Sequence, residues 1–283
     1  MLSKDNRILI VGLGLIGGSY AQALKRQGYD VGAVTRSQET IDYALEQGLI
    51  DRGTVTPTAE FVGAYDIIVF ALYPHVFLKW IADYQQFIKP GALLTDVTGV
   101  KCSVVYEVQK LLRPDLEFVG AHPMAGREVY GVRNADCGIF KGANYIVTPT
   151  DANTEEAIRT VEQLGETLGF ARISRLAPER HDEMIGFLSQ LTHCIAVALM
   201  TCKDVEDLYA YTGDSFRDLT RIAKINDEMW SELFMLNRDE LLSQIDVFSE
   251  RLGELRSAIE SGDTEAMREL MRLSTKRRKY FDK

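Results

Sequence analysis

Residues 7–20, RILIVGLGLIGGSY, decide the fold of this chain. Four apolar residues lead into a glycine-rich turn, and helix-forming residues follow it, so the stretch predicts a strand, a tight turn and a helix. In a dinucleotide-binding fold the first glycine of G-x-G-x-x-G makes the turn, the second lets the backbone approach the pyrophosphate, and the third allows close helix–strand packing. Because the motif stands between a strand and a helix, a bound dinucleotide is favoured over a purely structural turn. The residues expected to bind it are Gly12, Gly14, Leu15, Ile16 and Gly17.

The end of the second predicted strand indicates which dinucleotide binds. A cofactor with a free ribose 2′-hydroxyl usually meets Asp or Glu about 20 residues after the glycines. This chain has Thr35, Arg36 and Ser37 there instead. No acid repels a 2′-phosphate, and the planar Arg36 cation with two neighbouring hydroxyls suits one. The sequence therefore favours NADP, and the alternative is that Arg36 stacks on adenine and NAD binds as well.

Short apolar runs alternate with helical patterns through the first part of the chain. The runs that predict strands are Ile8–Val11, Val31–Val34, Ile67–Leu72, Ala92–Thr95, Phe118–Ala121 and Tyr145–Val147. Strands that alternate with helices predict an α/β Rossmann-type fold, a doubly wound parallel sheet with helices on both faces. After about Ser174 the strand signals stop, and from Pro178 apolar residues recur at three- and four-residue steps. We therefore expect a sheet domain over 1–174 and an all-α domain over 175–283.

The composition limits the class of protein. A chain of 283 residues with 46% apolar content can bury a sizeable core and is long enough for two domains. Its formal net charge of −9 argues against broad nucleic-acid binding. The longest apolar runs fall short of a membrane span, and the first residues lack the apolar run of a signal peptide, so we expect no membrane partner and a cytoplasmic location. The four cysteines are scattered, which indicates reduced thiols and neither disulfides nor a metal site.

Two segments place polar residues at the carboxyl edge of the predicted sheet, where ligands of such folds lie. In LLTDVTGVKCS, residues 93–103, a predicted strand ends at Thr95, and Asp96, Thr98 and Lys101 follow it. In FVGAHPMAGREVYG, residues 118–131, His122 follows the next strand among small residues that leave room for a ligand. A single histidine is more often structural than catalytic, but this position favours a catalytic one.

A third segment with polar residues is the helix that begins near Pro178. Asp182, Ser189 and His193 are expected on one face of it, because 11 residues span about three helical turns. This face contributes to a site only if the helix meets the first domain.

Five motifs, in this order, resemble the prephenate and arogenate dehydrogenases of tyrosine biosynthesis. They are GLGLIGGS at 12–19, DVTGVK at 96–101, GAHPMAGREVYG at 120–131, RHDEMIGFLSQLTH at 180–193 and FRDLTRIAKINDEMW at 216–230. The resemblance implies an NAD(P)-dependent enzyme that oxidises and decarboxylates prephenate to 4-hydroxyphenylpyruvate and CO2. Arogenate, which has an amino group in place of the side-chain keto group and gives tyrosine directly, is the alternative substrate, and prephenate is favoured. The resemblance also implies a homodimer formed through the helical domain.

The resemblance assigns roles to particular residues. His122 matches the base for the substrate 4-hydroxyl, and Arg221 matches the arginine that holds the side-chain carboxylate. His193 matches a histidine near the substrate. Arg127 and Glu128 follow the catalytic loop, where relatives often have a polar pair at the pocket entrance. Lys101, at the ligand edge of the sheet, is expected to contact the substrate as well.

Trp230 matches a tryptophan near the site, although a place as an ordinary core aromatic fits it equally well. Two positions depart from the family pattern. Gly99 stands where relatives commonly carry a serine, so Thr98 is the expected source of a catalytic hydroxyl from the neighbouring position. The frequent Ser-His-Leu-Pro-His pattern is Ser-Gln-Leu-Thr-His at 189–193, which keeps only the second histidine. His122 and Arg221 are intact, so we expect an active enzyme.

Two other interpretations compete with this one. Another Rossmann oxidoreductase with a helical second domain, such as a β-hydroxyacid dehydrogenase, would share the glycine turn. It would not explain HPMAG together with FRDLTRIAK. A redox sensor that binds NADP without turnover would be marked by loss of His122 or Arg221, and both are present.

Overall fold

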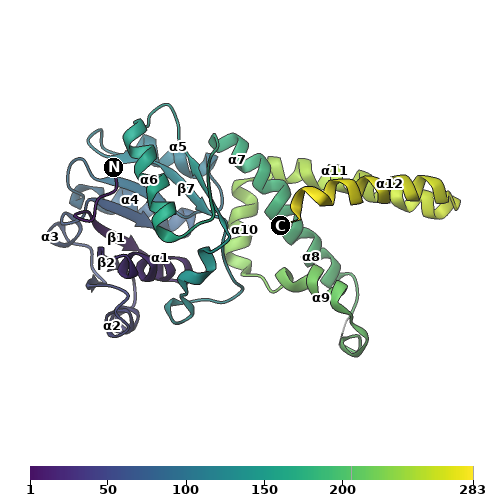
Figure 1. Ribbon diagram of the computed structural model, residues 1–283, viewed down its shortest axis with the longest axis horizontal. Coiled ribbons are helices and arrows are strands. Elements are labelled where there is room, and N and C mark those ends of the chain that lie inside the picture. The colour runs from purple at the N-terminus through teal and green to yellow at the C-terminus, as the bar shows by residue number, and fades with distance from the viewer. Residues whose placement is uncertain (205, 283) are drawn as a thin grey trace.

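The computed structural model describes residues 1–204 and 206–282, and it shows a sheet-containing N-terminal region joined to a helical C-terminal region (Figure 1). The strands of the large sheet are β1 (Arg7–Val11), β2 (Asp30–Val34), β3 (Arg52–Thr54), β4 (Ile67–Phe70), β5 (Leu93–Asp96) and β6 (Glu117–Phe118). All pair in parallel, in the order β3-β2-β1-β4-β5-β6. The strand order reverses between β1 and β4, as in a doubly wound sheet. The predicted fold class is confirmed.

The helices of this region connect the strands and cover the sheet. They are α1 (Leu15–Arg26), α2 (Gln38–Glu46), α3 (Ala59–Val62), α4 (Pro74–Tyr84), α5 (Cys102–Leu111) and α6 (Glu155–Leu168). Short helical turns are η1 (Gln85–Phe87), η2 (Val132–Asn134) and η3 (Cys137–Phe140).

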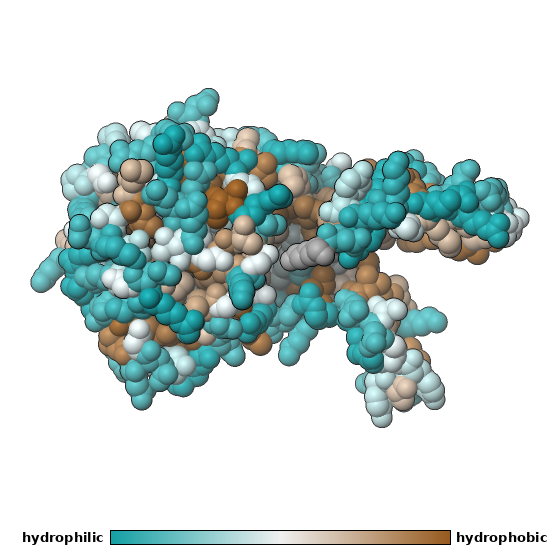
Figure 2. Space-filling view, viewed as in Figure 1, coloured by the Kyte–Doolittle hydropathy of each residue, from teal (hydrophilic) through white to brown (hydrophobic). Residues whose placement is uncertain are grey.

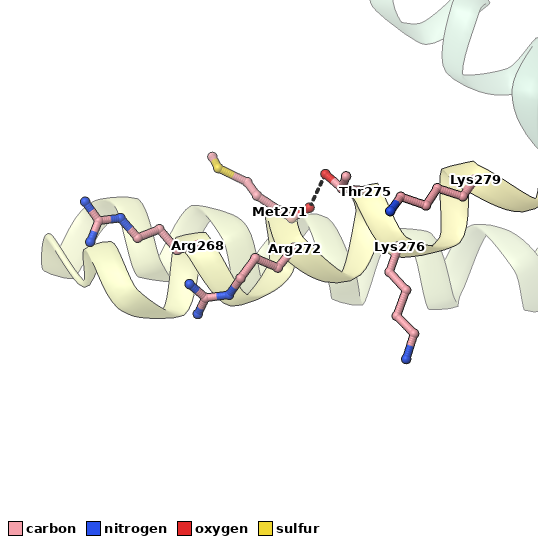
Figure 3. Close-up of a pocket in the computed structure, with 6 residues that line it drawn as sticks. All are labelled: Arg268, Met271, Arg272, Thr275, Lys276 and Lys279. Atoms are coloured by element: carbon pink, nitrogen blue, oxygen red, sulfur yellow. Dashed lines mark hydrogen bonds between the residues drawn. The ribbon is translucent and has the colours of Figure 1, made fainter. Parts of the chain in front are cut away.

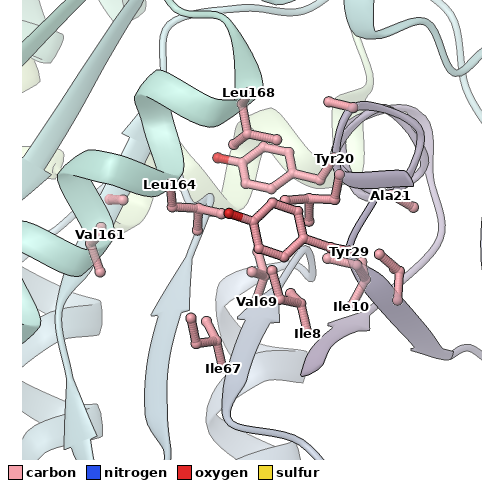
Figure 4. Close-up of a cluster of buried hydrophobic side chains, with 14 of the residues drawn as sticks. Ile8, Ile10, Tyr20, Ala21, Tyr29, Ile67, Val69, Val161, Leu164 and Leu168 are labelled. Atoms are coloured by element: carbon pink, nitrogen blue, oxygen red, sulfur yellow. The ribbon is translucent and has the colours of Figure 1, made fainter. Parts of the chain in front are cut away.

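The central strands contribute side chains to two hydrophobic cores, one on each face of the sheet, because side chains alternate along a strand. Ile8 belongs to one core and its neighbour Leu9 to the other. On the first face α1 and α6 cover the sheet, and Figure 4 shows Tyr20 of α1 beside Leu164 and Leu168 of α6. Strands buried on both faces must be apolar on both, which is why they appear in the sequence as continuous apolar runs.

A second sheet of three strands departs from the prediction of a single parallel sheet. Its strands are β7 (Gly120–Pro123), β8 (Asn144–Thr148) and β9 (Arg172–Arg175); β7 and β8 pair antiparallel, and β8 and β9 pair in parallel. The predicted strand Phe118–Ala121 is therefore divided between two sheets. The sequence does not predict β3 and β9 because both are short and polar. The expected boundary at residue 174, near the end of β9, stays a prediction.

The C-terminal region is helical. Its elements are α7 (Pro178–Ile185), a π-helical turn (Gly186–Gln190), α8 (Leu191–Thr201), η5 (Tyr209–Tyr211), α9 (Asp214–Thr220), η6 (Arg221–Ala223), α10 (Asp227–Leu236), α11 (Arg238–Ser261), α12 (Thr264–Arg278) and η7 (Lys279–Phe281). Figure 1 shows α11 and α12 side by side, projecting away from the sheet.

One continuous helical segment, Pro178–Thr201, is long and apolar enough to cross a membrane by length and composition alone, with a mean hydropathy of 1.6 over its most apolar window. A core helix of a soluble protein passes the same test. In this segment His181 and Asp182 are buried and hydrogen-bonded to the N-terminal region. We therefore interpret the segment as the helix that joins the two regions.

A buried ion pair fixes the backbone of β7, the first strand of the second sheet. Lys101 and Asp96 are both fully buried, with Nζ and Oδ2 2.7 Å apart. Lys101 Nζ also donates to Ala121 O at 2.5 Å, and Asp96 Oδ1 accepts the Ala121 N–H at 2.9 Å. Both polar backbone groups of Ala121 are thus held by this pair, and the next residue is His122.

Replacing Lys101 by Met should lower the free energy of unfolding by about 3–5 kcal/mol, because it leaves the Asp96 carboxylate buried and unpaired. The matched control is Lys89→Met, which removes a partly exposed partner of Asp66 and should cost about 1 kcal/mol or less. Urea denaturation of the two variants measures the difference. Equal decreases in the free energy of unfolding would show that the buried pair contributes no more to stability than the partly exposed one.

Candidate functional site

The glycine turn between β1 and α1 has the geometry of a phosphate-binding turn. Gly12 has φ of +99°, and a Cβ there would lie 2.4 Å from a backbone carbonyl oxygen after β4, so only glycine fits. A Cβ on Gly17 would lie 1.9 Å from the Gly12 carbonyl oxygen, which explains the close approach of the helix to the turn. Gly14 is the N-cap of α1 and has open space at its Cβ position. The first turn, with Leu15 and Ile16, has no side-chain cap and no acidic residue, so its N–H groups fit a pyrophosphate.

Thr35, Arg36 and Ser37 lie where β2 ends and α2 begins. This place adjoins the glycine turn, because the Gly12 N–H donates to Val34 O at 2.8 Å. Ser37 caps α2 by accepting the N–H of Thr40, and Arg36 is exposed to solvent. An exposed guanidinium beside hydroxyls is chemically suited to a phosphate on the adenosine ribose.

His122, at the end of β7, is linked to the helical region by a chain of hydrogen bonds. Its Nδ1 lies 2.9 Å from Nε2 of His181, and Nδ1 of His181 lies 2.7 Å from Oδ1 of Asp182. The two oxygens of Asp182 also accept the N–H groups of Lys101 and Cys102, each at 2.8 Å. Asp182 therefore caps α5, which has no side-chain cap of its own. One carboxylate of the helical region orients both a helix and a histidine of the sheet region.

The hydrogen bonds that link Asp182, His181 and His122 determine which ring nitrogens carry protons. An ionised carboxylate can only accept hydrogen bonds, so His181 Nδ1 must donate to Asp182. In the neutral ring Nε2 of His181 is then an acceptor, and His122 Nδ1 must donate to it. His122 Nε2 is left with a free lone pair, which is the form that a general base requires.

Burial of the two histidines and hydrogen bonds to Asp182 keep these groups in the required charge states. Burial lowers the pKa of His122 well below its usual 6.5, and the neighbouring His181 and Lys101 lower it further. Burial also lowers the pKa of His181, despite its hydrogen bond to Asp182. For Asp182 burial acts in the opposite direction, but the hydrogen bonds from His181 and from two backbone N–H groups keep its pKa below the usual value. At neutral pH the rings of His122 and His181 are therefore neutral, and Asp182 is an ionised carboxylate.

The free Nε2 of His122 faces Gly99. A Cβ on Gly99 would lie 3.8 Å from this nitrogen and 3.6 Å from Leu233 of α10. Gly99, the position for which the family resemblance implies a serine, therefore borders this nitrogen, and a glycine leaves the Cβ contact with it unfilled.

The structure corrects the expectations for Thr98 and Lys101. The buried Thr98 hydroxyl is hydrogen-bonded to Asp96 and lies 3.0 Å from Val100 O, so it does not replace the missing serine. Lys101 Nζ is surrounded by Asp96, Thr98 and the carbonyl of Ala121, which leaves no donor for a substrate. Both side chains instead hold the backbone next to His122.

A second group of predicted residues lies where the loop after β7 meets the helical region. Arg221 Nη1 is paired with Glu128 Oε1, and the Arg221 side chain is 65% exposed. The ring of His193 stacks on Trp230, with centroids 3.6 Å apart. His193 Nδ1 lies 2.8 Å from Ser189 O, so its Nε2 is free to face a ligand. Burial lowers the pKa of His193, which favours a neutral ring.

Two further expectations change with the structure. Arg127 pairs with Asp136 of its own loop at 2.9 Å and not with the Glu128 group. The π-helical turn at Gly186–Gln190 interrupts the regular spacing on which the shared face of Asp182 and His193 depended. Asp182 contacts α5, whereas His193 contacts α10.

His181 is a site residue that the sequence analysis does not single out. It lies inside the motif at 180–193, directly before Asp182, and this pairing of two titratable residues was the available signal. Its contact with His122 spans 59 residues of sequence and depends on the packing of the two regions.

A surface hollow on α12 has no part in this site. Figure 3 shows its lining residues on the ribbon of α12 and the turn after it: Arg268, Met271, Arg272, Thr275, Lys276 and Lys279. All six are exposed, so the hollow is an open, basic helix surface. Among the residues that the structure describes, no group of three or more His, Cys, Asp or Glu side chains could hold a metal ion.

The chain is similar to known proteins along nearly its whole length. Residues 20–174 match the family model for the nucleotide-binding domain of prephenate dehydrogenase, and residues 177–273 match the model for its dimerization domain. A prephenate dehydrogenase of Bacillus subtilis is 30% identical over 272 residues, which are 94% of this chain and 73% of that protein.

Two solved structures extend the similarity to three dimensions. A crystal structure of prephenate dehydrogenase from A. aeolicus, in complex with hydroxyphenyl propionate and NAD+, has a TM-score of 0.89 at 30% identity and covers 99% of both chains. A Synechocystis arogenate dehydrogenase has a TM-score of 0.83 at 26% identity and covers 98% of this chain and 100% of its own.

The lowered pKa values of His122, His181 and His193 predict that each ring takes up its proton at a lower pH in the folded protein than in the unfolded chain. The unfolded chain therefore binds more protons than the native state as the pH falls through 6.5, so the free energy of unfolding should decrease over this range. Ring ¹⁵N shifts of histidine-labelled protein measure both the titrations and the tautomers. A His122 ring that titrates with an ordinary pKa, or carries its proton on Nε2, would contradict the hydrogen-bond chain.

Proposed function

The chain belongs to the prephenate dehydrogenase family of oxidoreductases, and from this premise we propose that it oxidises and decarboxylates prephenate with NADP to 4-hydroxyphenylpyruvate and CO2. The observation that carries the proposal is the hydrogen-bond chain from Asp182 through His181, which leaves His122 neutral with its Nε2 unprotonated beside Gly99. When bound, the nicotinamide accepts the hydride that leaves C4 of the substrate.

His122 supplies the base for this reaction. Its Nε2 takes the proton of the 4-hydroxyl as C4 becomes a carbonyl carbon. The bond between C1 and the ring carboxylate then breaks, its electrons make the ring aromatic, and CO2 leaves. The same proton returns from His122 to the oxygen, which becomes the phenol hydroxyl. The Asp182–His181 pair keeps His122 in the tautomer that can perform both transfers.

Arg221 is the proposed partner of the side-chain carboxylate. Its guanidinium is largely exposed and already holds a carboxylate, that of Glu128, so a substrate carboxylate can replace Glu128 in the same kind of charge-assisted hydrogen bond. The stacked His193 and Trp230 lie on neighbouring helices of the same region and offer an apolar wall and a free ring nitrogen. Arg127, bound to Asp136, is assigned to the loop and not to the substrate.

NADP is favoured over NAD by the residues after β2. Arg36 is exposed there beside Thr35 and Ser37, and the strand end lacks the acid that would repel a 2′-phosphate.

We further propose that the protein is a cytoplasmic homodimer formed through its helical region. Apolar side chains of the projecting pair α11–α12 are exposed in the single chain: Leu242, Val247, Leu252, Ile259, Met271 and Leu273. Figure 2 shows hydrophobic residues on the lower side of this projection and on the neighbouring helices. A second copy would cover them. All four cysteines are free, as a reducing compartment requires.

The test of the proposal is the appearance of reduced cofactor in four mixtures, prephenate or arogenate with NADP or NAD. We expect the highest kcat/KM with prephenate and NADP. Activity with arogenate alone would support the same mechanism with arogenate as the substrate. Equal activity with both cofactors would refute the preference for NADP. No turnover in any mixture would refute the proposed activity.

His122→Asn should lower kcat by about 10²–10⁴, the usual contribution of a general base, while binding of NADP is unchanged. The matched control is His75→Asn, because His75 is an exposed histidine that pairs with Glu232 and lies outside the hydrogen-bond chain of Asp182, His181 and His122. Steady-state kinetics and a calorimetric titration with NADP give the two quantities. Near-normal turnover of His122→Asn would exclude His122 as the base.

A further inference from the structure

The loop between β7 and β8, residues 124–143, runs from the catalytic strand back onto the cofactor-binding helix. The Asp136 N–H donates to Ser19 Oγ of α1 at 3.0 Å, and the Cys137 N–H donates to Gln22 Oε1 at 2.7 Å. A Cβ on Gly18 of α1 would lie 2.8 Å from the Ala135 side chain, so the loop packs closely on the helix. These contacts fix the part of the loop that includes η2.

Arg133 in η2 extends from this loop to α2. Its Nη2 lies 3.1 Å from Glu39 Oε1, and its guanidinium carbon lies 4.6 Å from the ring centroid of Tyr43. Ser37 caps α2, and Glu39 is two residues further along, about 3 Å along the helix axis. The Arg133 cation is therefore within the first turns of α2, next to the segment that carries Arg36.

The ion pair of Arg133 with Glu39 is easily exchanged. The Arg133 side chain is 64% exposed and the Glu39 side chain 81% exposed, and exposed pairs of this kind contribute little net stability. The cation–π contact with Tyr43 does not involve Glu39, so it can remain when Glu39 is released. A phosphate has more negative charge than Glu39 and accepts two parallel hydrogen bonds from a guanidinium.

We propose that Arg133 is a second cation for the 2′-phosphate of NADP, which it binds together with Arg36 by releasing Glu39. This inference rests on the proposed use of NADP. It gives the cofactor phosphate two guanidiniums from different parts of the chain, one after β2 and one from the loop that follows the catalytic strand. Release of Glu39 leaves a carboxylate near the phosphate, which opposes binding, so removal of its charge in Glu39→Gln should not weaken the bound state.

The test measures binding without turnover. Adenosine 2′,5′-bisphosphate and 5′-AMP are titrated by calorimetry into the full chain and into Arg133→Met, Arg133→Lys, Glu39→Gln and Arg36→Met, with NADP and NAD as a second pair of ligands. Loss of a charge-assisted hydrogen bond predicts that Arg133→Met binds the 2′-phosphorylated ligands about ten- to a hundredfold more weakly. Binding of 5′-AMP and NAD should change by less than about twofold, since neither has the phosphate. Arg133→Lys should retain part of the affinity, and Glu39→Gln should bind the bisphosphate at least as tightly as the parent.

The variants separate failure of this inference from failure of the proposed function. If Arg36→Met loses the 2′-phosphorylated ligands selectively and Arg133→Met does not, NADP use stands and the role of Arg133 is refuted. If Arg133→Met weakens all four ligands equally, its effect is on the loop and the inference is also refuted. If the parent does not distinguish the bisphosphate from 5′-AMP, nor NADP from NAD, the preference for NADP fails and Arg133 has no phosphate to bind. Dehydrogenase activity does not enter any of these readouts.

Discussion

The site depends on the three hydrogen bonds that the buried Asp182 carboxylate accepts. Two come from backbone N–H groups at the start of α5, and one comes from His181. The first two join the helical region to the sheet region, and the third sets the tautomer of His181 and through it that of His122. Because one carboxylate serves both purposes, the relative position of the two regions and the basicity of His122 are coupled.

Much of the fold could be predicted from the sequence, because its signals are local. The glycine turn is required by the positive φ of Gly12 and by the lack of space at Gly17, and both requirements appear directly as glycines. Strands buried on both faces need continuous apolar residues. The sequence could not show that the run after residue 117 divides between two sheets, nor that β8 pairs antiparallel, because pairing partners lie far apart in sequence.

The sequence could predict which residues lie at the candidate site better than it could predict where their side chains point. His122, Arg221 and His193 could be named from motifs, but the side-chain direction of Thr98 and Lys101 could not, because a place at the sheet edge does not determine whether a side chain points toward the ligand or into the core. Both point into the core, where the Asp96 carboxylate attracts them. His181 shows the same limit, since its role exists only through contacts between regions.

The cap that Asp182 provides also restricts how the molecule can move. Domains that share a small polar interface usually rotate about a hinge to admit ligands. Here rotation would pull a buried carboxylate away from its three donors, which is costly in free energy. Opening is cheaper along the loop between β7 and β8, where Arg127, Glu128 and Arg133 are held by partly or largely exposed ion pairs. We therefore expect ligands to enter and leave when the loop between β7 and β8 opens, while the two regions keep their relative position.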